Sequence, residues 1–443
     1  MSRIFTLGAI AGAGGSRYWY GGIEGTSTGT TITPQTNSLI VAPNDDIIIG
    51  VRDATTSQNV LYKLSTKGRV LWQRVMTGQF EQAGGMVDAS NTNLYIAARD
   101  SVAGATMNVM SVSNPTSTTL AKTVAGTTDW GKKVLVDASG NIYSVNSHLP
   151  PNGGTEEGVM VRKYNSAGTI QWTRTIYGSN NYALIINDAC LDLNNDVIIC
   201  GMFLEIAAGT TDIIDFYVAK INGTSGAVTW TQRLTGTDLQ GANEYRGVTT
   251  DSAGNIFLNG HGHHSTAQPE DDMITVKYNT SGVLQWQRRI SMATTTGAEF
   301  GRGIVRKSNG SVVVAARAIS STDTYSLVNY DTNGNVLWQR TLTNFDIRSI
   351  GIDSKDDLII AGLTGNFSFF VLKIPSDGSK QGTYSLFGQD VVYANGAGTT
   401  ITSSFTAVTS PAITNSTATT TTTTTPTYSF ATTSKSITRT SIS

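Results

Sequence analysis

Residues 246–288 read RGVTTDSAGNIFLNGHGHHSTAQPEDDMITVKYNTSGVLQWQR. Four short runs rich in apolar and β-branched residues alternate in it with turns rich in Gly, Asn and Asp. The runs are 246–250, 255–258, 273–278 and 283–288. Alternating runs of this length, joined by such turns, are typical of an antiparallel meander of four strands. We name the strands A to D, from the inside of the fold outward.

The turn between strands A and B recurs along the chain. Each copy combines Asn, Asp, Gly, Ser, Thr, Ala or Lys and leads directly into an apolar run. The seven copies are 44–47, 91–94, 139–142, 194–197, 253–256, 309–312 and 355–358. Their starts lie 47, 48, 55, 59, 56 and 46 residues apart. Repeats of this period built from short strands indicate the blades of a propeller. We therefore predict an all-β fold, a seven-bladed β-propeller of four-stranded antiparallel blades.

A tryptophan recurs on strand D of five repeats, two residues before Arg or Gln. The five are Trp72, Trp172, Trp230, Trp286 and Trp338. Alternate residues of a strand share a face, so the Trp and the Arg that follows it lie together. One interpretation is an aromatic ladder for a carbohydrate. We favour a structural role, because repetition around a ring suits the sealing of gaps between blades, with the Arg lying over the indole.

The chain divides into three parts by composition and pattern. Residues 1–16 form a Gly-rich N-terminal lead, residues 17–388 the propeller, and residues 389–443 a Thr/Ser-rich extended arm. Arg17–Gly25 aligns with strand D, so we expect it to close the ring by pairing with 369–373 of the seventh repeat. A competing D strand, 382–388, would then lie beyond it or leave for the arm.

The arm has an unusual composition. From Gly398 to Ser443, 28 of 46 residues are Ser or Thr. Such a segment has too little apolar surface to order itself alone, although β-branched Thr favours extended chain. We predict extended strands that pack against other chains, either other virion proteins or copies of this chain, through residues 398–443. The alternative is a mucin-like glycosylated stalk.

Composition limits the classes of function. Charged residues make up 14% of the chain and the net charge is −1. This leaves no basic face for nucleic acid and no polybasic patch for a membrane. No apolar run is long enough to span a bilayer, so we predict no membrane span. A surface of Ser, Thr, Asn and Gly is typical of extracellular and virion proteins.

The fifth repeat has the richest loop between strands B and C. It carries His261, His263, His264, Asp271 and Asp272, and we identify it as the candidate ligand-facing loop. Two imidazoles and a carboxylate can bind a transition metal. Polar loops of this kind are more often solvated, so we predict exposed histidines and no metal.

Other metal or catalytic patterns are weak. The turn residues Asp137, Asp251 and Asp353 each supply one carboxylate, whereas a calcium loop needs several, so we expect them to bond the turn backbone. Residues 331–338 resemble the Asp-box hairpin of sialidases, but most arginines fall on D strands at the rim, and we assemble no central arginine cluster. We predict no catalytic residues, no cofactor and no enzyme activity.

The repeat at 251–257 and 276–288 resembles the propeller repeat of many bacterial surface proteins. It is also similar to propeller proteins encoded by tailed phages of marine bacteria, which often begin with a Gly-rich lead and an aromatic strand such as Tyr18-Trp19-Tyr20. The resemblance covers 17–388. It implies a non-enzymatic, oligomeric virion protein of a tail, baseplate or fibre that contacts host surface glycans. The alternatives are a secreted, cell-surface adhesin or lectin with a glycosylated stalk, and a sialidase-like glycan-active enzyme.

Overall fold

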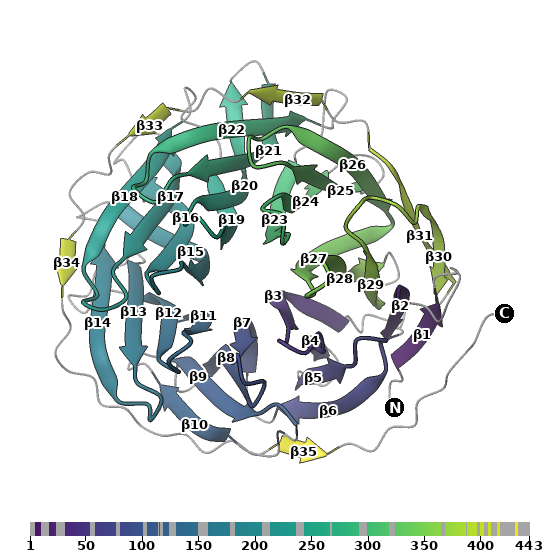
Figure 1. The fold of residues 1–443 in the computed structure, drawn as a ribbon, viewed down its shortest axis with the longest axis horizontal. Coiled ribbons are helices and arrows are strands. Elements are labelled where there is room, and N and C mark those ends of the chain that lie inside the picture. The colour runs from purple at the N-terminus through teal and green to yellow at the C-terminus, as the bar shows by residue number, and fades with distance from the viewer. Residues whose placement is uncertain are drawn as a thin grey trace.

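The computed structural model of the chain describes residues 5–9, 17–23, 32–53, 58–76, 80–100, 104–113, 115, 118–123, 130–148, 158–177, 182–205, 213–235, 243–265, 268–291, 299–318, 324–364, 368–386, 388–396, 399–402, 406–408, 414–416 and 430–432. The regular elements among these residues are all β-strands, arranged in seven sheets around one axis (Figure 1). The predicted seven-bladed propeller is confirmed. No helix of the described residues is long and apolar enough to cross a membrane.

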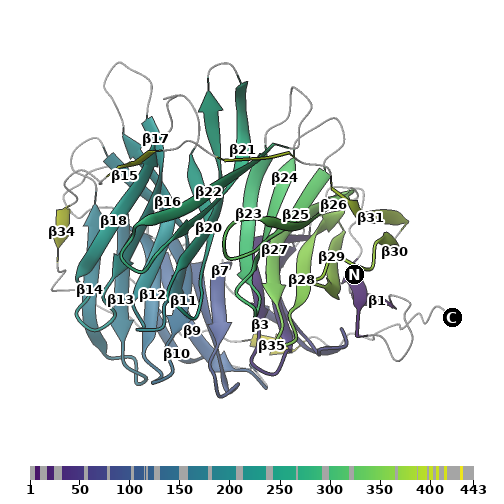
Figure 2. The same ribbon diagram turned by 45° about the horizontal axis from the view of Figure 1, so that its top comes forward.

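Each blade is an antiparallel sheet whose first strand lies at the axis (Figures 1 and 2). Blades 1 to 3 contain β3 (Ile32–Val41), β4 (Ile47–Asp53), β5 (Gln58–Leu64) and β6 (Val70–Met76); β7 (Phe80–Val87), β8 (Asn93–Asp100), β9 (Gly104–Ser111) and β10 (Thr118–Thr123); and β11 (Trp130–Val136), β12 (Ile142–His148), β13 (Gly158–Tyr164) and β14 (Ile170–Tyr177). Blades 4 and 5 contain β15 (Tyr182–Leu191), β16 (Val197–Glu205), β17 (Ile213–Ile221) and β18 (Val228–Thr235); and β19 (Glu244–Thr250), β20 (Ile256–Ser265), β21 (Gln268–Tyr278) and β22 (Leu284–Ser291). Blades 6 and 7 contain β23 (Glu299–Arg306), β24 (Val312–Ala318), β25 (Thr324–Tyr330) and β26 (Val336–Thr343); and β27 (Phe345–Ile352), β28 (Asp357–Thr364), β29 (Phe369–Pro375) and β2 (Trp19–Ile23).

The backbone conformation of the turn between the first two strands explains why its sequence motif recurs. Each turn between the first two strands of a blade places one residue in the left-handed region of backbone space. These residues are Asp45, Asn91, Gly140, Asn195, Gly254, Gly310 and Asp356. Gly, Asn and Asp enter this region at the lowest cost. The recurring turn motif therefore records a backbone requirement that every blade shares.

The core lies between blades. Buried side chains of one sheet pack against the facing side of the next sheet, as Phe216 and Val218 of blade 4 do against Tyr245 and Ile274 of blade 5. The rings of Phe216 and Tyr245 are 4.7 Å apart. Since each blade buries both faces in this way, no blade has a complete core without its neighbours.

A hydrogen bond from one indole to the next blade recurs around the outer seam. The Nε1–H of each strand-D tryptophan donates to a carbonyl oxygen just after the third strand of the following blade. The pairs are Trp19 to Thr66 at 3.0 Å, Trp72 to Val112 at 2.9 Å, Trp172 to Gly223 at 3.2 Å, Trp230 to Thr280 at 3.2 Å, Trp286 to Thr332 at 3.0 Å, and Trp338 to Ser376 at 3.1 Å. The structure thus places all five predicted tryptophans, and Trp19, at seams. Only Trp19 and Trp72 are fully buried, whereas the other four are partly exposed at the rim.

A glycine with positive φ completes the seam. A Cβ on Gly334 would lie 2.8 Å from the Trp286 ring, and one on Gly282 would lie 2.8 Å from the Trp230 ring. The arginine two residues after the tryptophan donates to the carbonyl of the same glycine, as Arg288 does to Gly334 at 2.8 Å. The Arg288 guanidinium also lies 5.6 Å from the Trp286 ring. The indole is therefore held between a turn that only glycine fits and a cation.

The ring closes through the N-terminal strand, as predicted. β2 pairs with β29 in antiparallel register, from Trp19 opposite Lys373 to Ile23 opposite Phe369. The competing strand β30 (Gly382–Leu386) leaves blade 7 and pairs with β31 (Gln389–Asn395). β31 in turn adds to β26 of blade 6. β1 (Phe5–Ala9), from the Gly-rich lead, adds outside β2.

The described strands of the arm lie around the outside of the propeller (Figure 1). They pass the blades in the order opposite to the chain: β32 (Thr399–Thr402) pairs with β22, β33 (Thr406–Val408) with β18, β34 (Thr414–Ser416) with β14, and β35 (Phe430–Thr432) with β6. We call β31 to β35 the belt.

The belt shows where the described strands of the arm find partners. The predicted extended strands are found, and β32 to β35 pair with outer strands of the same chain, whereas their packing against other chains stays a prediction. Each outer blade strand has an open edge of backbone N–H and C=O groups, and a nearby Thr-rich strand can satisfy it. The propeller itself therefore supplies the partner that the composition of the arm requires.

Two N-terminal deletions test whether β2 is needed to close the ring. Deletion of residues 1–16 removes β1 alone and should lower the melting temperature by only a few degrees. Deletion of residues 1–25 also removes β2, its backbone pairing with β29 and the buried Trp19, and should lower the melting temperature sharply. Differential scanning calorimetry measures both. Equal melting of the two variants would show that β2 is dispensable for closure.

Replacement of one seam tryptophan tests the outer seam. Trp286→Ala removes the bond to Thr332 and the ring contacts with Phe257 and Tyr330, both 6.0 Å between centroids. It should cost about 3 kcal/mol of unfolding free energy. Trp286→Phe keeps most of the packing and should cost about 1 kcal/mol, the value of the lost hydrogen bond. Guanidinium unfolding measures both, and a neutral alanine variant would contradict a sealing role.

Candidate functional site

The loop predicted to face a ligand is largely a β-hairpin. β20 and β21 extend through it, with His261 opposite Met273 and His263 opposite Asp271. His261 is buried at 1% exposure, so its predicted exposure is wrong. Asp272 is also buried and pairs with Arg289 at 3.0 Å. His263, His264 and Asp271 have described backbones only, so the predicted exposure of these histidine side chains lies outside the described residues.

The turn aspartates bond their own turns, as expected. Oδ1 of Asp251 accepts the N–H of Ala253 at 2.9 Å and of Asn255 at 2.8 Å, and Asp137 and Asp353 bond the corresponding amides of their turns. Among the side chains that the structure describes, no group of three His, Cys, Asp or Glu residues stands close enough to hold a metal ion.

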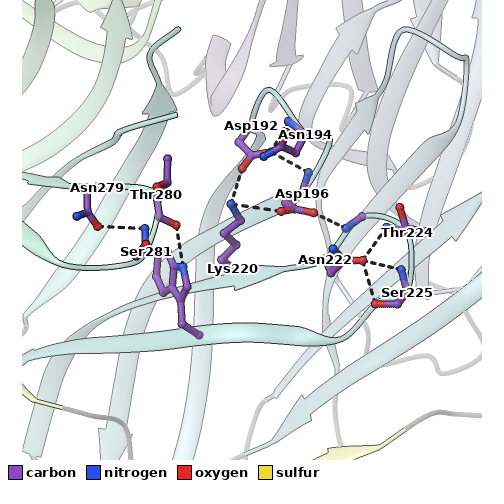
Figure 3. Close-up of polar contacts among 12 residues, drawn as sticks. Asp192, Asn194, Asp196, Lys220, Asn222, Thr224, Ser225, Asn279, Thr280 and Ser281 are labelled. Carbon is purple, nitrogen blue, oxygen red and sulfur yellow. Dashed lines mark hydrogen bonds and ion pairs between the residues drawn. The ribbon is translucent and has the colours of Figure 1, made fainter. Parts of the chain in front are cut away.

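Blade 4 shows how these turns join a third strand (Figure 3). Lys220 donates to Asp192 at 2.7 Å and lies 3.2 Å from Asp196. Asp196 in turn accepts the backbone N–H of Gly223 at 2.8 Å, which ties the two turns of the blade together. This face of the blade is a structural network of buried charges whose partners satisfy one another.

A β-bulge interrupts the axial strand of blades 3 to 7 at one level. The register between the first and second strands skips one residue in each of these blades. The skipped residues are Lys132, Asn187, Arg246, Arg302 and Arg348. A bulge bends its strand and re-aims the side chain of the extra residue. Three consecutive blades thus carry an arginine at the same place near the axis.

Small residues beside the bulges let neighbouring blades approach closely near the axis. A Cβ on Gly247 would lie 3.1 Å from Gly303 Cα, and one on Gly301 would lie 2.6 Å from backbone atoms of Gly260. The bulged side chains of neighbouring blades are therefore brought together. The charges of Arg246 and Arg348 both act on Arg302. We call Arg246, Arg302 and Arg348 the axial arginines.

Glu244 anchors one side of the axial arginines. Its Oε2 accepts the Nδ2–H of Asn187 from blade 4 at 2.9 Å. Its Oε1 forms an ion pair with Arg246 and lies 3.3 Å from Nε2 of His261. Burial, and then the charges of Arg246 and Arg302, lower the pKa of His261 to about 3. The imidazole is therefore neutral and donates its Nε2–H to the carboxylate.

Asp346 anchors the other side through an ion pair with Arg348. Arg302 lies between the two anchored arginines. Its pKa is lowered, chiefly by burial, against an opposing effect of Asp346 and with further lowering by Arg348 and Arg246. Its Nε is buried and has no hydrogen-bond partner among the described residues. Among the described side chains, the carboxylates paired with the three axial arginines are those of Glu244 and Asp346.

A cavity of about 290 Å³ lies on the axis next to the bulges of blades 6 and 7; its wall includes Arg306 but none of the three axial arginines. Gly303 and Ser349, the residues next to Arg302 and Arg348, line it together with Thr249, Thr250 and Ile350. Lys133 and Asp188, which pair at 2.9 Å, complete a part of the wall. The wall combines hydroxyl groups, backbone and aliphatic surface, which suits a small polar ligand.

The sequence pattern did not predict the cluster of axial arginines, because most arginines of the chain occur on outer strands. Their signal was present: in repeats 5 to 7 an Arg precedes a Gly or Ser at the same place in the first run, at 246–247, 302–303 and 348–349. The expectation of no central arginine cluster is wrong. A side chain shifted by a bulge breaks the alternation that assigns residues to faces, so the pattern alone places it incorrectly.

Comparisons with known proteins find only distant structural neighbours. No protein-family model and no curated protein matches the chain. Among solved structures, the chain is similar to the Dos1 propeller, with 8% identity over 78% of this chain and 94% of that chain and a TM-score of 0.45. An oligogalacturonate lyase from Vibrio parahaemolyticus has 8% identity over 85% and 98% and a TM-score of 0.43. A protein of unknown function from Bacteroides caccae has 12% identity over 65% and 93% and a TM-score of 0.37.

The buried His261 predicts a dependence of stability on pH. Because its pKa is about 3 in the folded state and about 6.5 in an unfolded chain, only the unfolded state takes up a proton as the pH falls below about 6.5. The stability present above pH 6.5 is therefore lost progressively toward pH 3. Between pH 7.5 and 5.5 the loss should be about 1.4 kcal/mol.

His261→Gln, which retains a donor for Glu244, should remove this contribution. Denaturant unfolding of both proteins at the two pH values measures the difference. If the free energy of unfolding changes between the two pH values by the same amount in the variant as in the unaltered protein, His261 takes up its proton in the folded protein as it does in the unfolded chain.

Proposed function

We propose that the chain is a non-enzymatic structural protein of a phage virion, carried on a tail, baseplate or fibre. On this proposal it contacts host surface glycans through the axial arginines and the cavity next to the bulges. The belt is the observation that supports this best. Subunits on a particle are held at high local concentration, where open sheet edges would pair with one another. The belt strands β32 to β35 have three or four residues, whereas the outer blade strands that they pair with have seven or eight, and short edge strands pair poorly.

The belt also supports attachment through residues 398–443. β32 to β35 are the outermost strands of their sheets, so a neighbour that contacts the rim of the propeller meets them first (Figure 1). Among the described strands none pairs with their second edges, so these edges can accept a strand of another virion protein or of another copy of this chain. On this proposal the arm has two roles, one on its own propeller and one toward the particle.

Particle composition tests the proposal. Particles purified by density gradient should contain the chain in a constant ratio to the major capsid protein by quantitative mass spectrometry. Truncation after Gly396, which removes β32 to β35, should preserve the propeller by circular dichroism and abolish incorporation. Recovery of the full chain only from the soluble fraction, with glycan mass added to its threonines, would instead support a secreted adhesin with a glycosylated stalk.

The axial arginines favour a second candidate, a sialidase-like glycan-active enzyme. Clustered guanidinium groups recognise the carboxylate of an acidic sugar in a binding protein and in a hydrolase alike. Release of fluorophore from a sialoside or uronide substrate by the purified chain, lost in Arg302→Gln, would support the enzyme. Binding of such sugars without turnover supports the non-enzymatic proposal.

A further inference from the structure

We propose that Arg246, Arg302 and Arg348 bind a carboxylate group on the propeller axis, and that the ligand is an acidic monosaccharide unit such as a uronate. This inference rests on the glycan contact of the proposed function and names the chemistry of that contact. It concerns the isolated chain, so it holds or fails independently of whether the chain is found in a virion.

The charge balance of the cluster favours an anion. Glu244 already bonds Asn187, His261 and Arg246 through its two oxygens. Asp346 is paired with Arg348. The third guanidinium, Arg302, has no ion pair among the described residues, and Asp346 offsets its charge only through space, with one carboxylate oxygen that itself has no partner there. In this partly buried place an unpaired charge is costly. An added carboxylate restores the balance.

The geometry of the donors favours a carboxylate over a single-atom anion. Arginine presents parallel N–H groups that match the two oxygens of a carboxylate, and such paired bonds are stronger than neutral ones. Arg246 and Arg348 are each oriented by an acidic partner two residues earlier on the same strand. Oriented side chains lose less conformational freedom on binding, so the site is partly preorganised.

The adjoining cavity indicates a sugar-sized ligand. Its volume of about 290 Å³ is at the lower end of the range for small-molecule pockets. Thr249 and Ser349 can bond sugar hydroxyls, and Ile304 and Ile350 offer apolar surface for the ring. Near Arg246 and Arg302, Nδ1 of the buried His261 has no partner among the described residues. As a neutral imidazole nitrogen it can accept a hydroxyl proton.

Calorimetric titration of the full chain with glucuronate tests the proposal. Binding is expected with a Kd on the order of 1 mM, weakening as salt is added. Arg302→Gln should weaken it about tenfold or more, which is the loss of one charged hydrogen bond. Arg69→Gln, which replaces an exposed arginine in a turn of blade 1, should bind like the unaltered chain.

Two further ligands and one further variant complete the test. Glucose, which lacks the carboxylate, should not bind, and acetate should bind more weakly than glucuronate because it lacks the sugar ring. If Arg302→Gln does not fold by circular dichroism, Arg302→Lys keeps the charge and removes the paired donors. Equal binding of sulfate and glucuronate would overturn the carboxylate assignment. No binding of glucuronate, or equal binding by all variants, would overturn the site.

Discussion

The hydrogen bond from the indole of one blade to a carbonyl of the next is the constraint on which the ring depends. A blade of four strands has two apolar faces and cannot bury either of them alone. At the seam of blades 5 and 6, Trp286 bonds Thr332 while Gly334 of the same turn lies against its ring, so one residue contacts the next blade in two ways. Trp19 makes the same bond to Thr66 across the point of closure, so the N-terminal strand completes the ring by the rule that governs the other seams.

The axial strands differ from the outer strands in that their bulged residue changes from blade to blade. Close packing at the axis requires small residues such as Gly247 and Gly301, and the bulge next to them adds one residue per blade without changing the seam. That extra residue differs between blades: it is Lys in blade 3, Asn in blade 4 and Arg in blades 5 to 7. The outer seam repeats the indole bond in six of the seven blades, the exception being blade 2, whose fourth strand has no tryptophan. The axis, by contrast, varies from blade to blade. Variation at the axis is where recognition of a ligand can arise without loss of the fold.

The ends of the chain are used at the outer edges of the blades. β1 adds to blade 7, and the belt adds to blades 1, 3, 4, 5 and 6. The Thr-rich belt has little apolar surface, so its strands are held by backbone hydrogen bonds to the outer strands and by the cross-strand contacts of β-branched side chains. The belt strands depend on the propeller for their order, and they cover part of the outer edges of the blades that they join.

The sequence by itself determined the number of blades, the positions of the turns and the strand that closes the ring. These features are local: a left-handed turn selects Gly, Asn or Asp wherever it recurs, and Trp19 matches the other tryptophans in spacing. Only the tertiary structure decided the course of the belt, the burial of His261 and the meeting of the axial arginines. The partner of a Thr-rich strand is an edge far away in the chain, and no local pattern specifies it. A bulge likewise changes which face a side chain occupies, so Arg246, Arg302 and Arg348, which lie 46 or more residues apart, meet only when three blades pack around one axis.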